Sequence, residues 1–184
     1  WDVVELPSQF LENWCWQEES LSMMSEHFET GESLPKDMLD KMLAAKHFQS
    51  GMMMMRQVEF SLFDFLLHRD FSEKDNNNVL GLMDAVRNKV SVLKPPEYTR
   101  FSHAFSHIFS GGYAAGYYSY KWAEVLAADA FSRFEEEGIF NPKTGLDFKE
   151  QILQKGGSIE AVDMFVNFRG RKPSVEPLLK QAGM

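Results

Sequence analysis

Apolar positions recur at helical spacing along most of the chain. In the segment 76–93 the apolar positions step by four, three, four and three residues, which is the pattern of one helical stripe: Val79, Met83, Val86, Val90 and Leu93. A shorter stripe formed by Met38, Leu39, Met42 and Leu43 predicts a second helix, whose start is marked by Ser33 and Pro35.

The segment 49–71 is apolar almost all round, which predicts a largely buried central helix. Near the end of the chain, Gly156 and Gly157 are expected to close one helix, and Ser158 to cap the next. Gly170 and the Pro173-Ser174 pair predict a similar break before a short last helix. Two-residue alternation of strand length is hard to find, so the predicted fold class is all-α, with several helices in one segment over residues 1–184.

Composition narrows the classes of function. The 184 residues are 44% apolar and 25% charged, the balance of an ordinary globular protein. The formal net charge is −8 and no basic block occurs, so we expect no nucleic-acid partner. No apolar run approaches the roughly 20 residues that cross a bilayer, so we expect no membrane partner. The chain begins at Trp1 without a methionine, which leads us to expect a piece of a longer protein.

Cys15 is the single cysteine and excludes an internal disulfide. It lies between two tryptophans without a protease motif, so we expect a small buried apolar residue. The sequence also lacks the Glu-x-x-His pairs of di-iron bundles, a phosphate-binding glycine loop and a nucleophile elbow.

The opening segment carries two glutamates seven residues apart, Glu5 and Glu12, with Gln9 between them. A helix through this segment, with Pro7 in its first turn, would place all three on one face. Such a face is ordinarily solvated surface. The functional interpretation is a carboxylate metal ligand backed by a second carboxylate.

A long irregular stretch is expected over 94–112, and such stretches in compact domains are often functional. Within it, His103 and His107 have the four-residue spacing of two zinc ligands on one helical face. Ala104 stands where a His-Glu-x-x-His helix needs its glutamate, so hydrogen-bonded histidines are the simpler interpretation. Gly111 and Gly112 permit positive φ and a close approach of the backbone to another group, such as a substrate.

Three tyrosines follow this stretch: Tyr113, Tyr117 and Tyr120. On a helix their spacing would place them within about 60° of one another. Tyr118, Trp122 and Val125 would lie on the opposite side, so one aromatic face is expected to be core. The other face is either a packing boundary or a row of hydroxyl donors able to stabilise an oxyanion.

Together these segments resemble the thimet oligopeptidase family of zinc peptidases, most closely its oligopeptidase A branch. The resemblance runs through Val4-Glu5-Leu6-Pro7-Ser8-Gln9, the segment from His107 to Tyr120, and then Phe131-Ser132-Arg133-Phe134 and Phe168-Arg169-Gly170-Arg171. It covers essentially the whole chain, and the tyrosine–glycine run is its most specific part. The resemblance implies that residues 1–184 are the helical C-terminal segment of a zincin-type oligopeptidase catalytic domain.

The resemblance implies a role for each matching residue. Glu5 would be the third zinc ligand, with Glu12 close behind it, and Tyr120 would hydrogen-bond the oxyanion. The remaining matches would hold the substrate backbone or form the flexible loop beside it: His107, Tyr113, Tyr117, Gly111 and Gly112. The implied activity is hydrolysis of short peptides in the cytoplasm by an endopeptidase that carries one Zn²⁺.

The sequence departs from the family in lacking the helix with two histidines and the glutamate base. We therefore expect this chain alone to be inactive, and the remainder of the same polypeptide to complete the zinc site. The rival hypothesis is a non-catalytic helical module that binds a peptide or a partner helix with its aromatic face.

Overall fold

The computed structural model describes residues 1–72 and 78–184, and these residues form helices and connecting turns without any β-strand. The predicted all-α class is confirmed. The chain divides into two compact units, residues 49–121 and a second unit made of residues 1–48 and 122–184. Within the described ranges, no helix has both the length and the apolar character that a membrane crossing requires.

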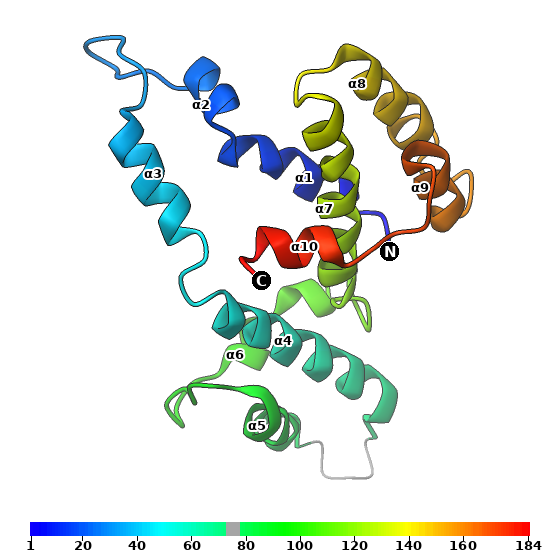
Figure 1. Ribbon diagram of the computed structural model, residues 1–184. Coiled ribbons are helices and arrows are strands. Elements are labelled where there is room, and N and C mark those ends of the chain that lie inside the picture. Colours follow the sequence, from blue (N-terminus) through cyan, green and yellow to red (C-terminus); the bar gives the residue numbers. More distant parts are fainter. Residues whose placement is uncertain (73–77) are drawn as a thin grey trace. The chain divides into compact units, whose positions relative to one another are not determined.

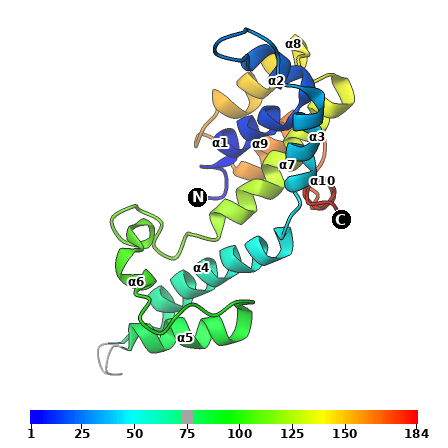
Figure 2. The same ribbon diagram turned by 90° about the vertical axis from the view of Figure 1, so that its left-hand side faces the viewer.

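The unit formed by residues 1–48 and 122–184 is built around α7 (Ser119–Glu137), which enters it at Trp122. Its other elements are α1 (Leu6–Glu12), a 3₁₀ turn (Asn13–Trp16), α2 (Glu18–Met24), α3 (Lys36–Ala45), α8 (Pro142–Phe148), a π-helical turn (Lys149–Leu153), α9 (Ala161–Arg169) and α10 (Glu176–Gln181). In both views α1 lies beside α7 (Figures 1 and 2). Half of the twelve buried residues that the structure describes in the shared core are phenylalanines, and α1, α7, α8 and α9 all contribute to it: Leu6, Phe10, Leu126, Phe131, Phe134, Phe148, Phe165 and Phe168 among others.

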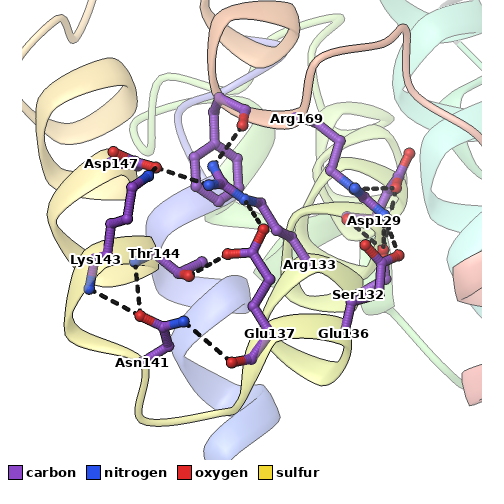
Figure 3. A network of polar contacts seen from close by, with 11 residues as sticks. Asp129, Ser132, Arg133, Glu136, Glu137, Asn141, Lys143, Thr144, Asp147 and Arg169 are labelled. Carbon is purple, nitrogen blue, oxygen red and sulfur yellow. Dashed lines mark hydrogen bonds and ion pairs between the residues drawn. The ribbon is translucent and has the colours of Figure 1, made fainter.

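A polar network ties α7 to α8 and α9 at the edge of this core (Figure 3). Arg133 on α7 donates to Asp147 on α8 at 2.7 Å and to the Phe168 carbonyl on α9 at 2.8 Å. Asn141 caps α8 by accepting the Lys143 N–H at 3.0 Å. The pKa of the Asp147 carboxyl is lowered by hydrogen bonds from Lys143 and Arg133, so the network stays charged at neutral pH.

A second tie fastens the segment after α9 to α7. Asp129 is fully buried, and both of its oxygens are held by the Arg171 guanidinium, at 2.6 and 2.7 Å. The same carboxylate accepts the Ser174 backbone N–H at 2.7 Å. Gly170 ends α9 with φ +79°, as its predicted breaking role requires, and the short last helix, α10, follows.

The unit of residues 49–121 contains α4 (Ser50–Asp70), α5 (Val79–Val90), α6 (Phe101–Ala104) and a 3₁₀ turn (Ser106–Ile108). Helices α4 and α5 lie side by side in both views (Figures 1 and 2). The core between these elements contains Phe63, Leu67, Met83, Val86, Phe105 and Ile108.

The helix predicted over 49–71 is confirmed, but its expected burial is wrong in part. Only four of its residues are buried, and two of those are the carboxylates Glu59 and Asp64. Met53 and Phe65 are 55% and 44% exposed. One face of α4 packs on the core of its unit, and its remaining apolar side chains reach the surface of the chain.

Several predicted boundaries shift. The helix expected over 76–93 ends at Val90, and Leu93, outside it, is 74% exposed; positions 76 and 77 lie outside the described residues. The expected cap at Ser158 is wrong, because α9 begins at Ala161 and Glu160 holds the N-cap position without a side-chain cap. Cys15 is exposed, which corrects its expected burial: in the 3₁₀ turn it is Trp14 that packs on the core.

Candidate functional site

Three tyrosines and a histidine gather in the unit of residues 49–121. The rings of Tyr113 and Tyr120 are stacked, with centroids 5.0 Å apart and planes at 18°. Tyr117 lies 5.1 Å from Tyr120. His107 lies 6.0 Å from Tyr113, 6.0 Å from Tyr117 and 6.2 Å from Tyr120. We call these four residues the tyrosine–histidine cluster.

The cluster does not arise from the predicted helical spacing. Helix α7 begins at Ser119, so Tyr113 and Tyr117 precede it in a series of turns. Ala115 has a left-handed backbone with φ +55°, which a continuous helix excludes. The expected grouping of the three rings is found, but it is produced by a turn that folds Tyr113 and Tyr117 back onto Tyr120.

Of the two aromatic faces considered in the sequence, the one with Tyr118 and Trp122 is not core. Tyr118 and Trp122 are 43% and 53% exposed. Apart from the polar Ser119 and Asp129, the buried positions of α7 carry apolar side chains: Ala123, Leu126, Ala127, Ala128, Ala130, Phe131 and Phe134. The buried face of α7 is thus a different one from the face that carries Trp122.

A buried carboxylate on α4 holds the turn. Asp64 is 1% exposed, and its Oδ1 and Oδ2 atoms accept the backbone N–H groups of Ala115 and Tyr117, each at 2.9 Å. Its Oδ1 also lies 2.8 Å from Nδ1 of His68. Asp64 was not singled out in the sequence, because an aspartate within a mostly apolar helix gives no indication of a partner more than fifty residues away.

Tyr117 is partly buried and packs against the core of its unit. Its ring meets Phe60 and Phe105 edge-on, and its hydroxyl donates to the Gln57 side chain at 3.4 Å. Burial, and to a smaller extent the neighbouring Tyr120, raise the pKa of the Tyr117 phenol above its ordinary value. The phenol therefore remains a proton-bearing hydrogen-bond donor throughout the neutral pH range.

Gly111 and Gly112, between His107 and Tyr113, are each required for a different structural reason. A Cβ atom on Gly111 would come within 2.7 Å of the His107 Cα atom, so only glycine lets the chain turn back there. Gly112 adopts φ +82°, which glycine tolerates best. The close approach expected from this pair is thus made to the chain itself at His107, and the Tyr113 N–H donates to the His107 carbonyl at 3.0 Å.

His103 and His107 do not share a helical face. Helix α6 ends at Ala104, and a separate 3₁₀ turn carries His107, so the four-residue spacing does not bring two imidazoles together as zinc ligands. Both side chains are exposed.

Glu5 occupies the N-cap position of α1 in the other unit. Ser8 donates its hydroxyl to the Glu5 carboxylate and to the Glu5 carbonyl, each at 2.9 Å, so the serine limits the orientations that the carboxylate adopts. Leu6 and Phe10 anchor the same helix in the core. Glu12 is exposed at the helix end, and its role behind Glu5 stays a prediction.

A catalytic zinc ion takes three protein ligands and a water molecule. No group of three or more His, Cys, Asp or Glu side chains suited to a metal occurs among residues 1–72 and 78–184. Glu5 offers one carboxylate of the right chemistry. These described residues alone therefore do not make a zinc site, and a metal at Glu5 would need further ligands.

Comparison with known proteins gives the class to which this helical chain belongs. The sequence model of the family described as "Peptidase family M3" matches residues 1–184, so the chain belongs to that family. It is 57% identical over 184 residues to oligopeptidase A of Escherichia coli (strain K12), and 47% identical over 188 residues to the organellar oligopeptidase A of Arabidopsis thaliana. It is 32% identical over 190 residues to the dipeptidyl carboxypeptidase of Escherichia coli (strain K12).

Each alignment covers 100% of this chain, but only 27%, 24% and 27% of those three relatives. The chain thus spans about a quarter of the length of the curated relatives it matches. Both oligopeptidases and a dipeptidyl carboxypeptidase are among them, so family membership alone does not set the mode of cleavage.

Proposed function

We propose that this chain is the helical C-terminal part of a zinc-dependent endopeptidase that hydrolyses short oligopeptides in the cytoplasm. The observation that carries the proposal is the tyrosine–histidine cluster, in which three phenols and an imidazole share one small region. Membership of peptidase family M3 and the identity to oligopeptidase A support a peptidase rather than a non-catalytic binding module.

In this proposal Glu5 supplies one zinc ligand, and the remaining ligands and the proton acceptor come from other parts of the polypeptide. The bound metal would supply a water molecule of lowered pKa. Ser8 keeps the Glu5 carboxylate oriented through its 2.9 Å hydrogen bond, which is the kind of outer contact that metal ligands commonly need.

Tyr120 acts as the hydrogen-bond donor to the peptide carbonyl oxygen as negative charge develops on it. A phenol held in place by neighbouring rings is preorganised for this task, and preorganised donors stabilise an oxyanion without reorganisation. Tyr113 stacks on Tyr120 and Tyr117 packs against it, so both fix the Tyr120 ring. His107, Tyr113 and Tyr117 would also hold the substrate backbone, while Gly111 and Gly112 shape the adjoining loop.

Two variants of the full-length enzyme test these roles, because each should impair a different function. Tyr120→Phe should keep its zinc and lose on the order of 100-fold in kcat, which is the usual cost of removing one oxyanion donor. Glu5→Gln should lose zinc, because the neutral amide is a poor ligand. Tyr98→Phe is the matched control, since Tyr98 is 80% exposed in the same unit as Tyr120.

The measurements are peptide hydrolysis at saturating substrate and zinc content per protein molecule. Unchanged turnover in Tyr120→Phe would refute the role of the phenol. Full zinc retention in Glu5→Gln would refute the role of the carboxylate.

A further inference from the structure

The Asp64 carboxylate is buried on α4, and most of its hydrogen bonds go to one turn of the chain. A buried carboxylate is costly unless it is paired and hydrogen-bonded. Asp64 has three partners: the backbone N–H groups of Ala115 and Tyr117, each at 2.9 Å, and the imidazole of His68 at 2.8 Å. Two of these three partners belong to the turn that carries the tyrosines.

His68 completes the arrangement as a hydrogen-bond donor. Its Nδ1 atom lies 2.8 Å from the Asp64 carboxylate and 2.9 Å from the Asp64 carbonyl oxygen. Both of these oxygens are acceptors, so Nδ1 must carry a hydrogen atom. The imidazole therefore fixes the side chain of Asp64 from the helix side, one turn further along α4.

The backbone of this turn needs a stabilising partner. Ala115 has φ +55°, a left-handed conformation that is unfavourable for a residue with a Cβ atom. The N–H groups of Ala115 and Tyr117 converge on one anion, as in the backbone concavities that bind anions in other proteins. Asp64 thus occupies that concavity and stabilises the strained backbone.

The consequence reaches the tyrosine–histidine cluster. The Tyr117 N–H is fixed by Asp64, and the Tyr117 ring contacts both His107 and Tyr120. Helix α7 begins only two residues later, so the direction in which Tyr120 enters that helix follows from the same turn.

We propose that Asp64, oriented by His68, is a positioning residue that sets the placement of Tyr117 and Tyr120 for peptide hydrolysis. This inference rests on the proposed function, in which Tyr120 donates to the reacting carbonyl. Asp64 acts through the backbone of the turn and does not touch the substrate.

The test uses the full-length enzyme with Asp64→Asn and a matched control, Glu59→Gln. Asparagine keeps the shape of aspartate, but its NH₂ group faces a backbone N–H that it cannot accept. Glu59 is equally buried on the same helix, and it pairs with Arg56, Arg87 and Ser91, none of which belongs to the tyrosine turn. The two variants therefore remove one buried negative charge each from α4, and only one of them disturbs the turn.

Asp64→Asn should lower kcat by about 10-fold to 100-fold without loss of zinc, because displacements near 1 Å cost about that much in preorganised sites. Its effect should shrink to less than about threefold when Tyr120 is already phenylalanine, since residues acting through one another are not additive. Glu59→Gln should have the same effect in both backgrounds. Hydrogen exchange should speed up in a peptide covering 113–118 for Asp64→Asn and not for Glu59→Gln.

His68 provides a second, milder pair of variants. His68→Asn keeps a donor near the position of Nδ1 and should retain most of the activity, whereas His68→Leu should lose several-fold in kcat. This pair decides the matter even where Asp64→Asn does not fold.

The outcomes separate the two claims. If Tyr120→Phe itself leaves kcat unchanged, the proposed function fails. If Tyr120→Phe impairs turnover but Asp64→Asn does not, or impairs it equally in both Tyr120 backgrounds, the positioning role of Asp64 is overturned. Equal activity of His68→Asn and His68→Leu also overturns it.

Discussion

Phe10 is the aromatic anchor of the helix that carries Glu5, and its removal should release that helix. The side chain is 2% exposed and stacks on Phe148 at 3.9 Å. It also meets three further rings, with centroids 5.0 to 6.4 Å away: Trp14, Phe131 and Phe134. Helix α1 has one other buried residue, Leu6, so Phe10→Ala removes half of its buried anchors.

The magnitude follows from the cavity that the ring leaves behind. A buried Phe→Ala change costs about 3–5 kcal/mol. Helix α1 has only seven residues, too few to be stable without packing, so we expect most of this cost to fall on local opening. At about 1.4 kcal/mol for each factor of ten, the lower end of this free-energy cost raises the population of the locally open helix roughly 100-fold. Hydrogen exchange through that open form should become faster by the same factor.

The assay is hydrogen exchange of the peptide covering residues 5–14 in the full-length enzyme, together with zinc content. Phe10→Ala should speed exchange in that peptide and reduce zinc occupancy, because Glu5 is at the start of the same helix. Leu11→Ala is the control, since Leu11 is next in sequence but 63% exposed. Equal exchange and equal zinc content in the two variants would refute the view that aromatic packing places Glu5.

Two further predictions concern charge and protonation. Asp129→Asn should lower the free energy of unfolding by about 3 kcal/mol, the low end for breaking a buried pair, because the Arg171 side chain is 42% exposed. The control is Glu136→Gln, since Glu136 is on the same helix but its side chain is 56% exposed; a denaturant midpoint of Asp129→Asn no lower than that of the control would contradict the prediction. Burial raises the pKa of Tyr117 in the folded protein, so the folded phenol keeps its proton at pH values where the unfolded phenol, with a pKa of about 10, has lost it. The folded protein therefore loses stability as the pH rises from the unfolded pKa to the folded pKa. Denaturation midpoints between about pH 9 and 11 should therefore fall less steeply for Tyr117→Phe than for the parent, and parallel curves would contradict the prediction.

Local pattern predicted the helices well where their apolar stripe is strong. The stripe at Met83 and Val86 is the buried face of α5, and Pro7 does mark the first turn of α1. The break predicted at Gly170 is found, and this residue has the positive φ that favours glycine at a helix end. These features depend on residues close together in sequence.

The features that the sequence did not reveal depend on distant partners. The spacing of the tyrosines predicted one helical face, whereas hydrogen bonds from Ala115 and Tyr117 to Asp64 hold this segment in a turn. Burial of α4 was overestimated because its apolar composition does not tell which face has a neighbour. The hydroxyl of Ser8 could have been noticed, since it lies one helical turn after Glu5.

The grouping of Glu5, the tyrosines and His107 as one functional set came from resemblance to a family, and spacing alone left simpler interpretations open. The structure adds how Glu5 and the tyrosine–histidine cluster are each held in place. Glu5 is placed by core packing of α1, and the tyrosine–histidine cluster by a carboxylate from α4.

The most direct measurement of the central claim is kcat for peptide hydrolysis by full-length Tyr120→Phe, determined on protein whose zinc content equals that of the parent. The proposed function predicts a decrease on the order of 100-fold with zinc retained, while Tyr98→Phe stays at the parental value. Parental turnover in the Tyr120→Phe enzyme would contradict the claim that the phenol stabilises the reacting carbonyl.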